Sequence, residues 1–266
     1  MTNDVTDDAF LGGALHILQP KAGYRAGLDA VLLAAAVPLR AGEAAHVLDA
    51  GAGAGAVGLA VAQRFSEARV TLAERDPGLI ALALRNITRN GLTGRVHAVA
   101  VDISQPLSPQ ASLHGQAGTF DHALANPPYH AEGKGTPSGN DLKAAAHAMP
   151  EGSLDRWVQF LAAMLRPGGT ATIIHRADAL AGVLGAFDRR FGGLVVFPLF
   201  PRTGKAASRI LVQGTKGSRA SLQMRAGAVL HEENGQFQPQ IEAILRQGAP
   251  LVLDKEAKPH APGEAC

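Results

Sequence analysis

The sequence predicts an α/β fold in which a mostly parallel β-sheet carries helices on both faces. Strand-like and helix-like apolar segments alternate through most of the chain, which is the order that produces a parallel sheet. The strand-like segments are continuous apolar runs, as expected for strands that are buried on both faces. The composition, 46% hydrophobic and 18% charged, supplies enough apolar material for one large core and excludes a disordered chain.

The apolar pattern and the punctuating glycines and prolines place the individual elements. Asp76-Pro77 suits an N-cap followed by proline at the first helical position, and Gly91 can end that helix. Ser153 can cap a second helix, which Pro167-Gly168-Gly169 would end. In chain order we expect a strand at 46–49, a helix at 55–65, a strand at 69–74, a helix at 76–90, strands at 96–101 and 120–125, a helix at 154–165, a strand at 170–175, an antiparallel strand pair at 195–200 and 208–213, and a helix at 238–246.

We expect one domain, because the 266 residues contain no internal repeat and no coherent linker. Its parts would be an N-terminal extension and helix (1–44), a ligand-binding and catalytic core (45–213), and a C-terminal hairpin, helix and tail (214–266). The segments 104–118 and 130–152 are expected to be irregular, and the tail after Asp254 to be frayed.

The sequence also indicates where the protein is located and whether it binds a metal ion. The N-terminus lacks the pattern of a signal peptide, and the longest apolar stretch, residues 30–39, is about half of what a membrane span needs. A cytoplasmic protein without a membrane segment is therefore expected. The single cysteine excludes a disulfide framework, and the ten histidines show no metal-ligand spacing, so no metal is expected.

The first predicted strand runs directly into a glycine-rich turn that contains Gly51, Gly53 and Gly55. Glycine lets the backbone turn sharply and lets a ligand approach the main chain closely. Glu74 ends the next predicted strand, where a carboxylate can accept hydrogen bonds from both hydroxyls of an adenosine ribose. The ligand is therefore expected to contain adenosine.

This turn leaves the identity of the ligand open. Gly53-x-Gly55-x-x-Gly58 also matches a dinucleotide fingerprint, so NAD and S-adenosylmethionine (SAM) are both possible, and tight helix–strand packing alone could explain the glycines. Asp49 favours SAM, because a carboxylate there would repel a pyrophosphate but can help to hold the ammonium group of methionine.

The predicted strand 120–125 runs into Asn126-Pro127-Pro128-Tyr129. The side-chain carbonyl of Asn126 and the main-chain carbonyl of Pro127 are two acceptors in a backbone that the prolines restrict. Two such acceptors can receive both N–H groups of an amide or exocyclic amine and aim its lone pair at an incoming methyl group. Tyr129 adds a flat face for stacking. Asn126, Pro127 and Tyr129 are thus the candidate catalytic residues, with a merely stiff loop as the alternative.

The strand order of the sheet would bring the glycine-rich turn and residues 126–129 together. Ligands bind open parallel sheets where the strand order reverses. If the strands at 46–49 and 120–125 are neighbours at that reversal, SAM and Asn126 meet in one crevice. Asp102 ends the strand between them in sequence, where it could meet the adenine amino group.

Residues 49–55, Glu74, Asp102 and residues 126–129 resemble the motifs of class I SAM-dependent N-methyltransferases, which act on exocyclic or amide nitrogen. The resemblance covers about residues 10–246. It implies SAM as the cofactor and a Rossmann-like sheet of seven strands, six parallel and one antiparallel, which fits the C-terminal strand pair.

The N-terminal segment narrows the resemblance. Residues 19–25 and the following 28–34 are similar to the N-terminal signature of the bacterial tRNA1(Val) (adenine-N6)-methyltransferase family. That resemblance implies that Tyr24, Arg25 and Asp29 border the SAM site. The alternative is an amphipathic helix packed on the sheet, with Asp29 in its first turn.

A basic segment is the candidate surface for a nucleic-acid substrate, tRNA or another. The chain has no acid from residue 200 to 225, but it has Arg202, Lys205, Arg209, Lys216, Arg219 and Arg225. Such a segment suits a surface that follows phosphates, or is simply a solvated hairpin face. Lys134 and His147, in the segment after Tyr129, join Arg202 and Lys205 as candidates for substrate contact.

The leading hypothesis is therefore SAM-dependent methylation of an exocyclic amino nitrogen, most specifically N6 of an adenine in tRNA. A protein glutamine amide, or a base in rRNA or DNA, could be the acceptor in the same chemistry. An NAD-dependent oxidoreductase is the alternative of another class.

Overall fold

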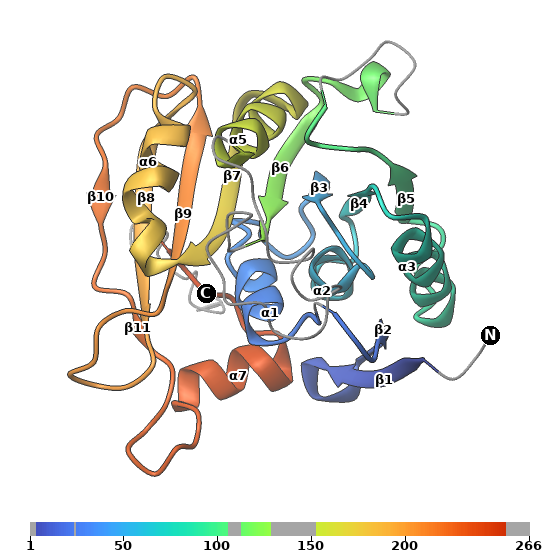
Figure 1. Ribbon diagram of the computed structural model, residues 1–266, viewed down its shortest axis with the longest axis horizontal. Helices are drawn as coiled ribbons and strands as arrows, with labels where there is room; N and C mark the ends of the chain where they lie inside the picture. Colours follow the sequence, from blue (N-terminus) through green and yellow to red (C-terminus); the bar gives the residue numbers. More distant parts are fainter. Residues whose placement is uncertain (1–3, 24, 106–112, 129–152, 254–266) are drawn as a thin grey trace, which may run out of the picture.

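The computed structural model describes residues 4–23, 25–105, 113–128 and 153–253, and its central feature is a twisted sheet flanked by helices (Figure 1). The elements, in chain order, are β1 (Val5–Phe10), β2 (Leu15–Pro20), α1 (Leu28–Ala35), β3 (His46–Ala50), α2 (Ala56–Arg64), β4 (Arg69–Glu74), α3 (Pro77–Arg89), β5 (Val96–Ala100), β6 (Phe120–Ala125), α5 (Ser153–Met164), β7 (Leu165–Arg176), α6 (Leu180–Phe187), β8 (Phe191–Phe200), β9 (Arg209–Lys216), β10 (Gln223–Met224), β11 (Ala228–Val229) and α7 (Pro239–Gln247). Short 3₁₀ turns occur at Leu11–Gly13, His114–Gln116 and Ala177–Ala179.

The strand order of the sheet is β10-β8-β9-β7-β6-β3-β4-β5, and β11 also pairs with β8. Strand β9 is antiparallel to both of its neighbours, β7 and β8, whereas the other pairs are parallel. The seven strands β3 to β9 thus confirm the expected sheet with its one antiparallel strand. The two-residue strands β10 and β11 extend it at the β8 edge beyond the seven that were expected.

Helices cover both faces of the sheet, as the continuous apolar strands predicted. Neighbouring residues of one strand enter different cores: Val47 belongs to the core with α1, α2, α3 and α7, whereas Leu48 belongs to the core with α5 and α6. Both side chains are fully buried. The alternation along β3 therefore fixes the two layers of helices that enclose the parallel strands (Figure 1).

The predicted boundaries hold for most elements and are wrong at three strands. The strand expected at 195–200 begins four residues earlier, at Phe191, and the strand expected at 208–213 continues to Lys216. The Asp76 side chain caps α3 by accepting a hydrogen bond from the main-chain N–H of Leu79 at 2.9 Å. The strand expected at 170–175 starts earlier, at Leu165, directly after α5. Pro167-Gly168-Gly169 does not separate the two elements, because it forms an irregularity within β7 where the pairing with β6 shifts.

Two features were not expected from the sequence. Helix α6 occupies residues 180–187. The antiparallel hairpin β1–β2 occupies most of the N-terminal extension. Leu15, Ile17 and Gln19 are buried on one side of β2, so the hairpin packs on the protein as a layer of its own.

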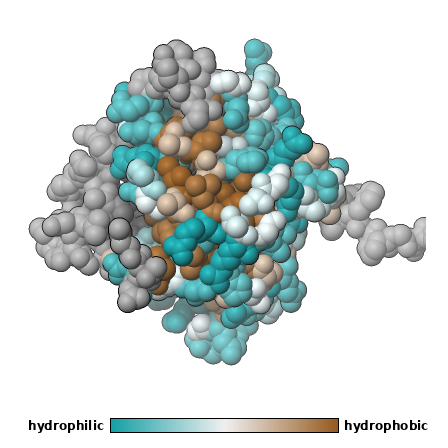
Figure 2. All heavy atoms as spheres, turned by 90° about the vertical axis from the view of Figure 1, so that its right-hand side faces the viewer, coloured by the Kyte–Doolittle hydropathy of each residue, from teal (hydrophilic) through white to brown (hydrophobic). Residues whose placement is uncertain are grey.

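The sheet edge formed by β5 is partly open. Figure 2 shows apolar side chains gathered on the side of the molecule that carries β5 and α3. Ala98 and Val99 of β5 are only half-buried, and Leu84 of α3 is 49% exposed. Among the described helices, none is long and apolar enough to cross a membrane. The predicted irregular segment 130–152 and the tail after residue 254 lie outside the described residues.

Candidate functional site

The two sequence motifs meet at the carboxyl edge of the sheet. Strand β3 lies between β4 and β6, and Ala50, its last residue, pairs with Ala73 on one side and Ala125 on the other. The chain proceeds from β3 outward to β5 and then returns to β6 on the opposite side of β3, so the strand order reverses here. Gly51 and Asn126 therefore begin adjacent loops at the reversal, as the sequence predicted.

The glycine turn adopts a conformation that other residues rarely take. Gly51, Gly53 and Gly55 have φ angles of +68°, +57° and +93°, values that favour glycine. The N–H groups of Gly51 and Ala52 donate to the carbonyl oxygen of Ala73 at 2.8 and 3.0 Å, which ties the turn to the end of β4. Main-chain hydrogen bonds within the protein thus hold the turn in place.

Neighbouring glycines of this turn face different surroundings. A Cβ built on Gly51 would lie 2.3 Å from the indole Cη2 of Trp157, on α5, so the turn and the ring are in direct contact. A Cβ on Gly53 would meet nothing within 4 Å. The main chain at Gly53 consequently borders open space in which a ligand can approach it.

Asp49 lies beneath the turn and is 1% exposed. Its carboxylate accepts a hydrogen bond from the main-chain N–H of Gly58, in α2, at 2.8 Å. Burial raises the pKa of Asp49 to about 7, and the negative charge of Glu74 adds to this, while the Gly58 bond opposes it. The carboxyl group therefore changes charge readily near neutral pH.

Glu74, the last residue of β4, accepts three main-chain hydrogen bonds. One oxygen accepts from Gly53 at 2.9 Å, and the other accepts from Arg75 at 2.8 Å and Asp76 at 2.9 Å. A carboxylate has about four lone-pair positions, so one position, on the oxygen that accepts from Gly53, is left for a further donor. Glu74 thereby connects the glycine turn with the start of α3.

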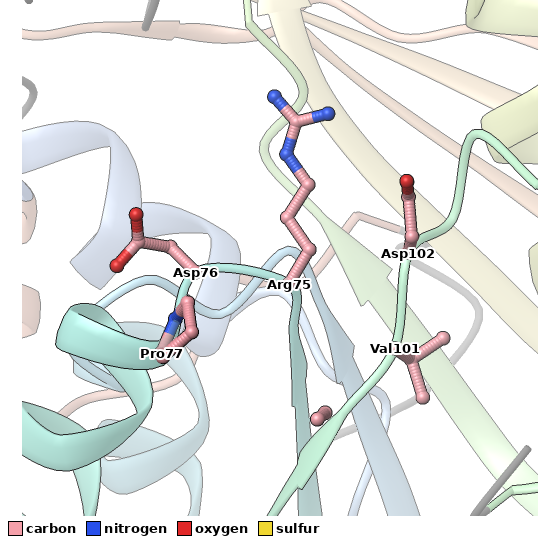
Figure 3. Close-up of a pocket in the computed structure, with 6 residues that line it drawn as sticks. Arg75, Asp76, Pro77, Val101 and Asp102 are labelled. Atoms are coloured by element: carbon pink, nitrogen blue, oxygen red, sulfur yellow. The ribbon is translucent and has the colours of Figure 1, made fainter.

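A recess of about 470 Å³ opens beside Glu74, between the ends of β4 and β5. Arg75, Asp76, Pro77, Ala100, Val101 and Asp102 line it. In Figure 3 the side chains of Arg75 and Asp102 extend in the same direction from the two neighbouring strand ends. One Asp102 oxygen accepts from the main chain and the hydroxyl of Ser104 at 2.9 and 2.7 Å, which orients the exposed carboxylate.

Asn126 and Pro127 follow β6 directly. Asn126 is half-buried, Pro127 is buried and Pro128 is half-buried. The strand pairing of Ala125 with Ala50 holds this segment next to the glycine turn. Of the predicted tetrad, Tyr129 lies outside the described residues, as do the other predicted contacts Tyr24, Lys134 and His147.

Arg25 and Asp29 are held in ion pairs. Arg25 donates to Asp8 of β1 at 2.7 and 2.8 Å. Asp29, in the first turn of α1, accepts from Arg209 of β9 at 2.9 Å. Both pairs join the N-terminal segment to other elements, so these two residues have a structural function whatever else they bind.

The residues of the basic segment are divided between the two ends of the sheet strands, so only some of them lie beside the glycine turn. Exposed Arg202 and Lys205 lie in the β8–β9 loop, at the same carboxyl edge as the glycine turn. Because β9 is antiparallel, it carries the chain away from that edge to Lys216, and exposed Arg219 lies beside Gly192 at the start of β8. Arg202 and Lys205 also share a recess with Glu232 and Glu233.

Trp157 and Arg75 contribute to the site but were not predicted. Trp157 is the only tryptophan of the chain, yet nothing in its local pattern indicates that α5 brings it to the glycine turn. Arg75 could have been expected from its position next to Glu74. Within the described ranges, no group of three or more His, Cys, Asp or Glu side chains could hold a metal ion.

A family model described as the methyltransferase small domain matches residues 27–159. Two relatives carry the name tRNA1(Val) (adenine(37)-N6)-methyltransferase. The protein from Shewanella halifaxensis is 30% identical over 66% of this chain and 68% of its own length. The protein from Shewanella sp. is 28% identical over 86% of this chain and 93% of its own length.

A solved structure resembles this chain over most of its length. It is a predicted O-methyltransferase from Agrobacterium tumefaciens, with a TM-score of 0.71 and 30% sequence identity. The match covers 84% of this chain and 98% of that protein.

Proposed function

Because this chain belongs to the methyltransferase small domain family and is a SAM-dependent methyltransferase, we propose that it methylates N6 of an adenine in tRNA. The observation that carries the proposal is the position of Asn126 beside the glycine turn, at the point where the strand order reverses. Family membership also removes the alternative of an NAD-dependent oxidoreductase.

The residues present fit SAM. The open space at Gly53 leaves room for the ligand to approach the main chain. Glu74 keeps one acceptor position, on the oxygen that also accepts from Gly53, for a ribose hydroxyl. The recess beside it has room for the adenine, with Asp102 as acceptor for its amino group. Asp49 supports the turn from below and, when ionised, favours the ammonium group of the methionine part. Arg25 and Asp29 border this site in the proposal.

The substrate amine is oriented by the loop after β6. The Asn126 side-chain carbonyl and the Pro127 main-chain carbonyl accept the two N–H groups, which turns the nitrogen lone pair toward the cofactor. SAM, when bound, supplies an electrophilic methyl group whose transfer leaves a neutral thioether. The same two acceptors stabilise the positive charge that develops on the nitrogen, and the methylated nitrogen then loses one proton to water. Tyr129 stacks on the base in this proposal.

A nucleic-acid substrate is favoured by the charges on the site edge. Arg202 and Lys205 are exposed there and can contact phosphates, and Tyr24, Lys134 and His147 are the further proposed contacts. Relatives named as tRNA adenine methyltransferases support tRNA in particular. We also propose that residues 1–266 form one domain and that the enzyme acts in the cytoplasm, where it meets tRNA.

The test is methyl transfer from radiolabelled SAM to separate tRNA, rRNA, DNA and protein fractions, followed by nucleoside analysis. We expect label in tRNA as N6-methyladenosine. Label confined to rRNA or DNA would move the acceptor to another nucleic acid. Label found only in protein, on glutamine, would contradict the nucleic-acid proposal.

The Asn126→Ala variant tests the proposed chemistry. Loss of one of two acceptors for the reacting amine should lower kcat/KM by about 100-fold or more, the size of effect seen when one electrostatic group of an active site is removed. Binding of S-adenosylhomocysteine (SAH), measured by calorimetry, should stay close to that of the wild type. A variant with normal turnover would show that Asn126 does not hold the amine.

A further inference from the structure

We infer that Asn86 is a positioning residue for the cofactor site, because it joins the glycine turn to the β1–β2 hairpin. The inference rests on the proposed placement of SAM at this turn. Asn86 lies on α3 and is completely buried. It is not adjacent in sequence to any of the predicted site residues.

The amide of Asn86 makes hydrogen bonds in two directions. Its Nδ2 donates to the carbonyl oxygen of Ala54 at 2.9 Å and to that of Leu18, in β2, at 3.0 Å. Its Oδ1 accepts from the main-chain N–H of Leu18 at 2.8 Å. Both donors and one acceptor position of the amide are thus occupied, and a buried amide with these partners has one defined orientation.

Ala54 stands between Gly53 and Gly55, so its carbonyl belongs to the turn itself. The neighbouring N–H of Gly53 donates to Glu74. The two ends of the Gly53–Ala54 segment are consequently held by side chains from two different elements, β4 and α3. The bond from Asn86 fixes the peptide orientation of a segment whose glycines would otherwise leave it free to rotate.

The β1–β2 hairpin, which holds Asn86 in position for its bond to Ala54, is itself anchored in the core. Leu15 and Ile17 of β2 are completely buried in the core on the α1–α2 side. One helical turn after Asn86, Asn90 forms an equivalent pair with β2: its Nδ2 donates to the carbonyl of His16 at 2.8 Å, and its Oδ1 accepts from the His16 N–H at 2.9 Å. In Figure 1 the hairpin lies beside α2 and α3.

Asn86 and Asn90 therefore form a natural matched pair. Each side-chain amide bonds to the N–H and the carbonyl of one β2 residue. These bonds satisfy main-chain groups of β2 on the side away from β1, where no other described strand pairs with it. Only Asn86 also reaches the glycine turn. Asn86 is completely buried and Asn90 half-buried, so the loss of stability is expected to be larger at Asn86. If both residues only held the hairpin, neither substitution would change the affinity for the cofactor, whereas a function in positioning the cofactor turn predicts a change at Asn86 alone.

The experiment compares Asn86→Ala with Asn90→Ala. We expect both variants to lower the melting temperature, because each removes one pair of hydrogen bonds to β2. The Kd for SAH, measured by calorimetry, should rise about tenfold in Asn86→Ala, the equivalent of one buried hydrogen bond, and should stay near the wild-type value in Asn90→Ala. Unchanged SAH binding in Asn86→Ala, or equal weakening in both variants, would overturn the inference.

A second measurement covers the case in which Asn86→Ala does not fold. Coupling between two sites is reciprocal, so SAH bound to the wild type should slow hydrogen exchange of the Leu18 amide. An exchange rate that SAH does not change would overturn the inference. Wild-type protein that binds SAH but methylates no tRNA would contradict the proposed substrate and leave the function of Asn86 intact, whereas wild-type protein that does not bind SAH would overturn both.

Discussion

At Asp49, burial and a nearby negative charge act on the same carboxyl group. Its pKa of about 7 lies above the ordinary value of 3.8 because the ionised form is buried and close to Glu74. Between these two values the folded chain binds more protons than the unfolded chain. The contribution of Asp49 to stability is therefore fully present below pH 3.8 and is lost as the pH rises through about 7.

The Asp49→Asn variant should show this loss directly. Asparagine is neutral at every pH and can still accept the bond from Gly58, so the free energy of unfolding should rise relative to the wild type more at pH 8 than at pH 5. Urea denaturation at the two pH values measures the difference. The exposed Glu67→Gln variant serves as the control for charge removal elsewhere. The same stability difference at both pH values would contradict the assignment.

At the scale of elements, the glycine turn is shaped by its neighbours β4 and α5. Main-chain bonds join it to Ala73 on β4, and Trp157 of α5 lies against Gly51. The turn therefore responds to substitution differently at each glycine, although the φ angles of Gly51 and Gly53 are similar. Because the chain has one tryptophan, fluorescence of Trp157 should report events at this turn.

Three alanine variants separate the contributions of strain, packing and ligand space. Gly42→Ala and Gly53→Ala both place a side chain at positive φ with nothing within 4 Å, so each should lose about 1 kcal/mol of stability. Of these two variants, only Gly53→Ala should also weaken SAH binding, because Gly42 lies outside the cofactor turn. Gly51→Ala adds a clash with Trp157 and should lose about 2–4 kcal/mol.

Chemical denaturation and Trp157 fluorescence during SAH titration measure these effects. Normal SAH binding by Gly53→Ala would show that the open space there is not used by the cofactor. Equal stability of Gly51→Ala and Gly42→Ala would show that Trp157 can move away from the turn at little cost.

Periodicity and turn chemistry predicted the elements that form the sheet, but not the hairpin before them. Residues 15, 17 and 19 of β2 do alternate with more exposed neighbours. The third of these is a glutamine, whose burial depends on bonds to Asp8 and to the main chain of Ala26. Because Gln19 is polar, the sequence does not show the alternation of apolar residues that would predict a strand, although the bonds to its partners allow it to be buried.

At the scale of the whole molecule, the antiparallel course of β9 separates charges that are close in sequence. Arg202 and Lys205 stay at the site edge, while Arg219 reaches the opposite edge of the sheet. The sequence therefore showed a run of basic residues, but it did not predict that these residues would lie at opposite ends of the strands. Motifs at strand ends were predictable in space because all parallel strands end at one edge, whereas Trp157 and Asn86 depend on how helices pack.

The separation of charges leads to a prediction about tRNA binding. The double variant Arg202→Ala/Lys205→Ala should bind tRNA more weakly and lower the slope of log K against log salt concentration by about 2, one for each lost phosphate contact. Arg219→Ala should leave both quantities unchanged. Filter binding over a range of salt concentrations measures the slope. A larger effect of Arg219→Ala would place the nucleic-acid surface at the opposite edge.

The pairing of β3 with β6 has a consequence for the growing chain. Strand β4, the near neighbour of β3 in sequence, supplies the bonds from Ala73 and Glu74 that hold the cofactor turn, whereas Asn126 follows β6, which pairs with the other side of β3 after β5 has been added. Distant pairings close long loops and form late. A nascent polypeptide that has left the ribosome as far as Asp102, just after β5, therefore already contains Asp49, Glu74 and Asp102, but it acquires Asn126, the residue proposed to orient the amine, only after the next strand.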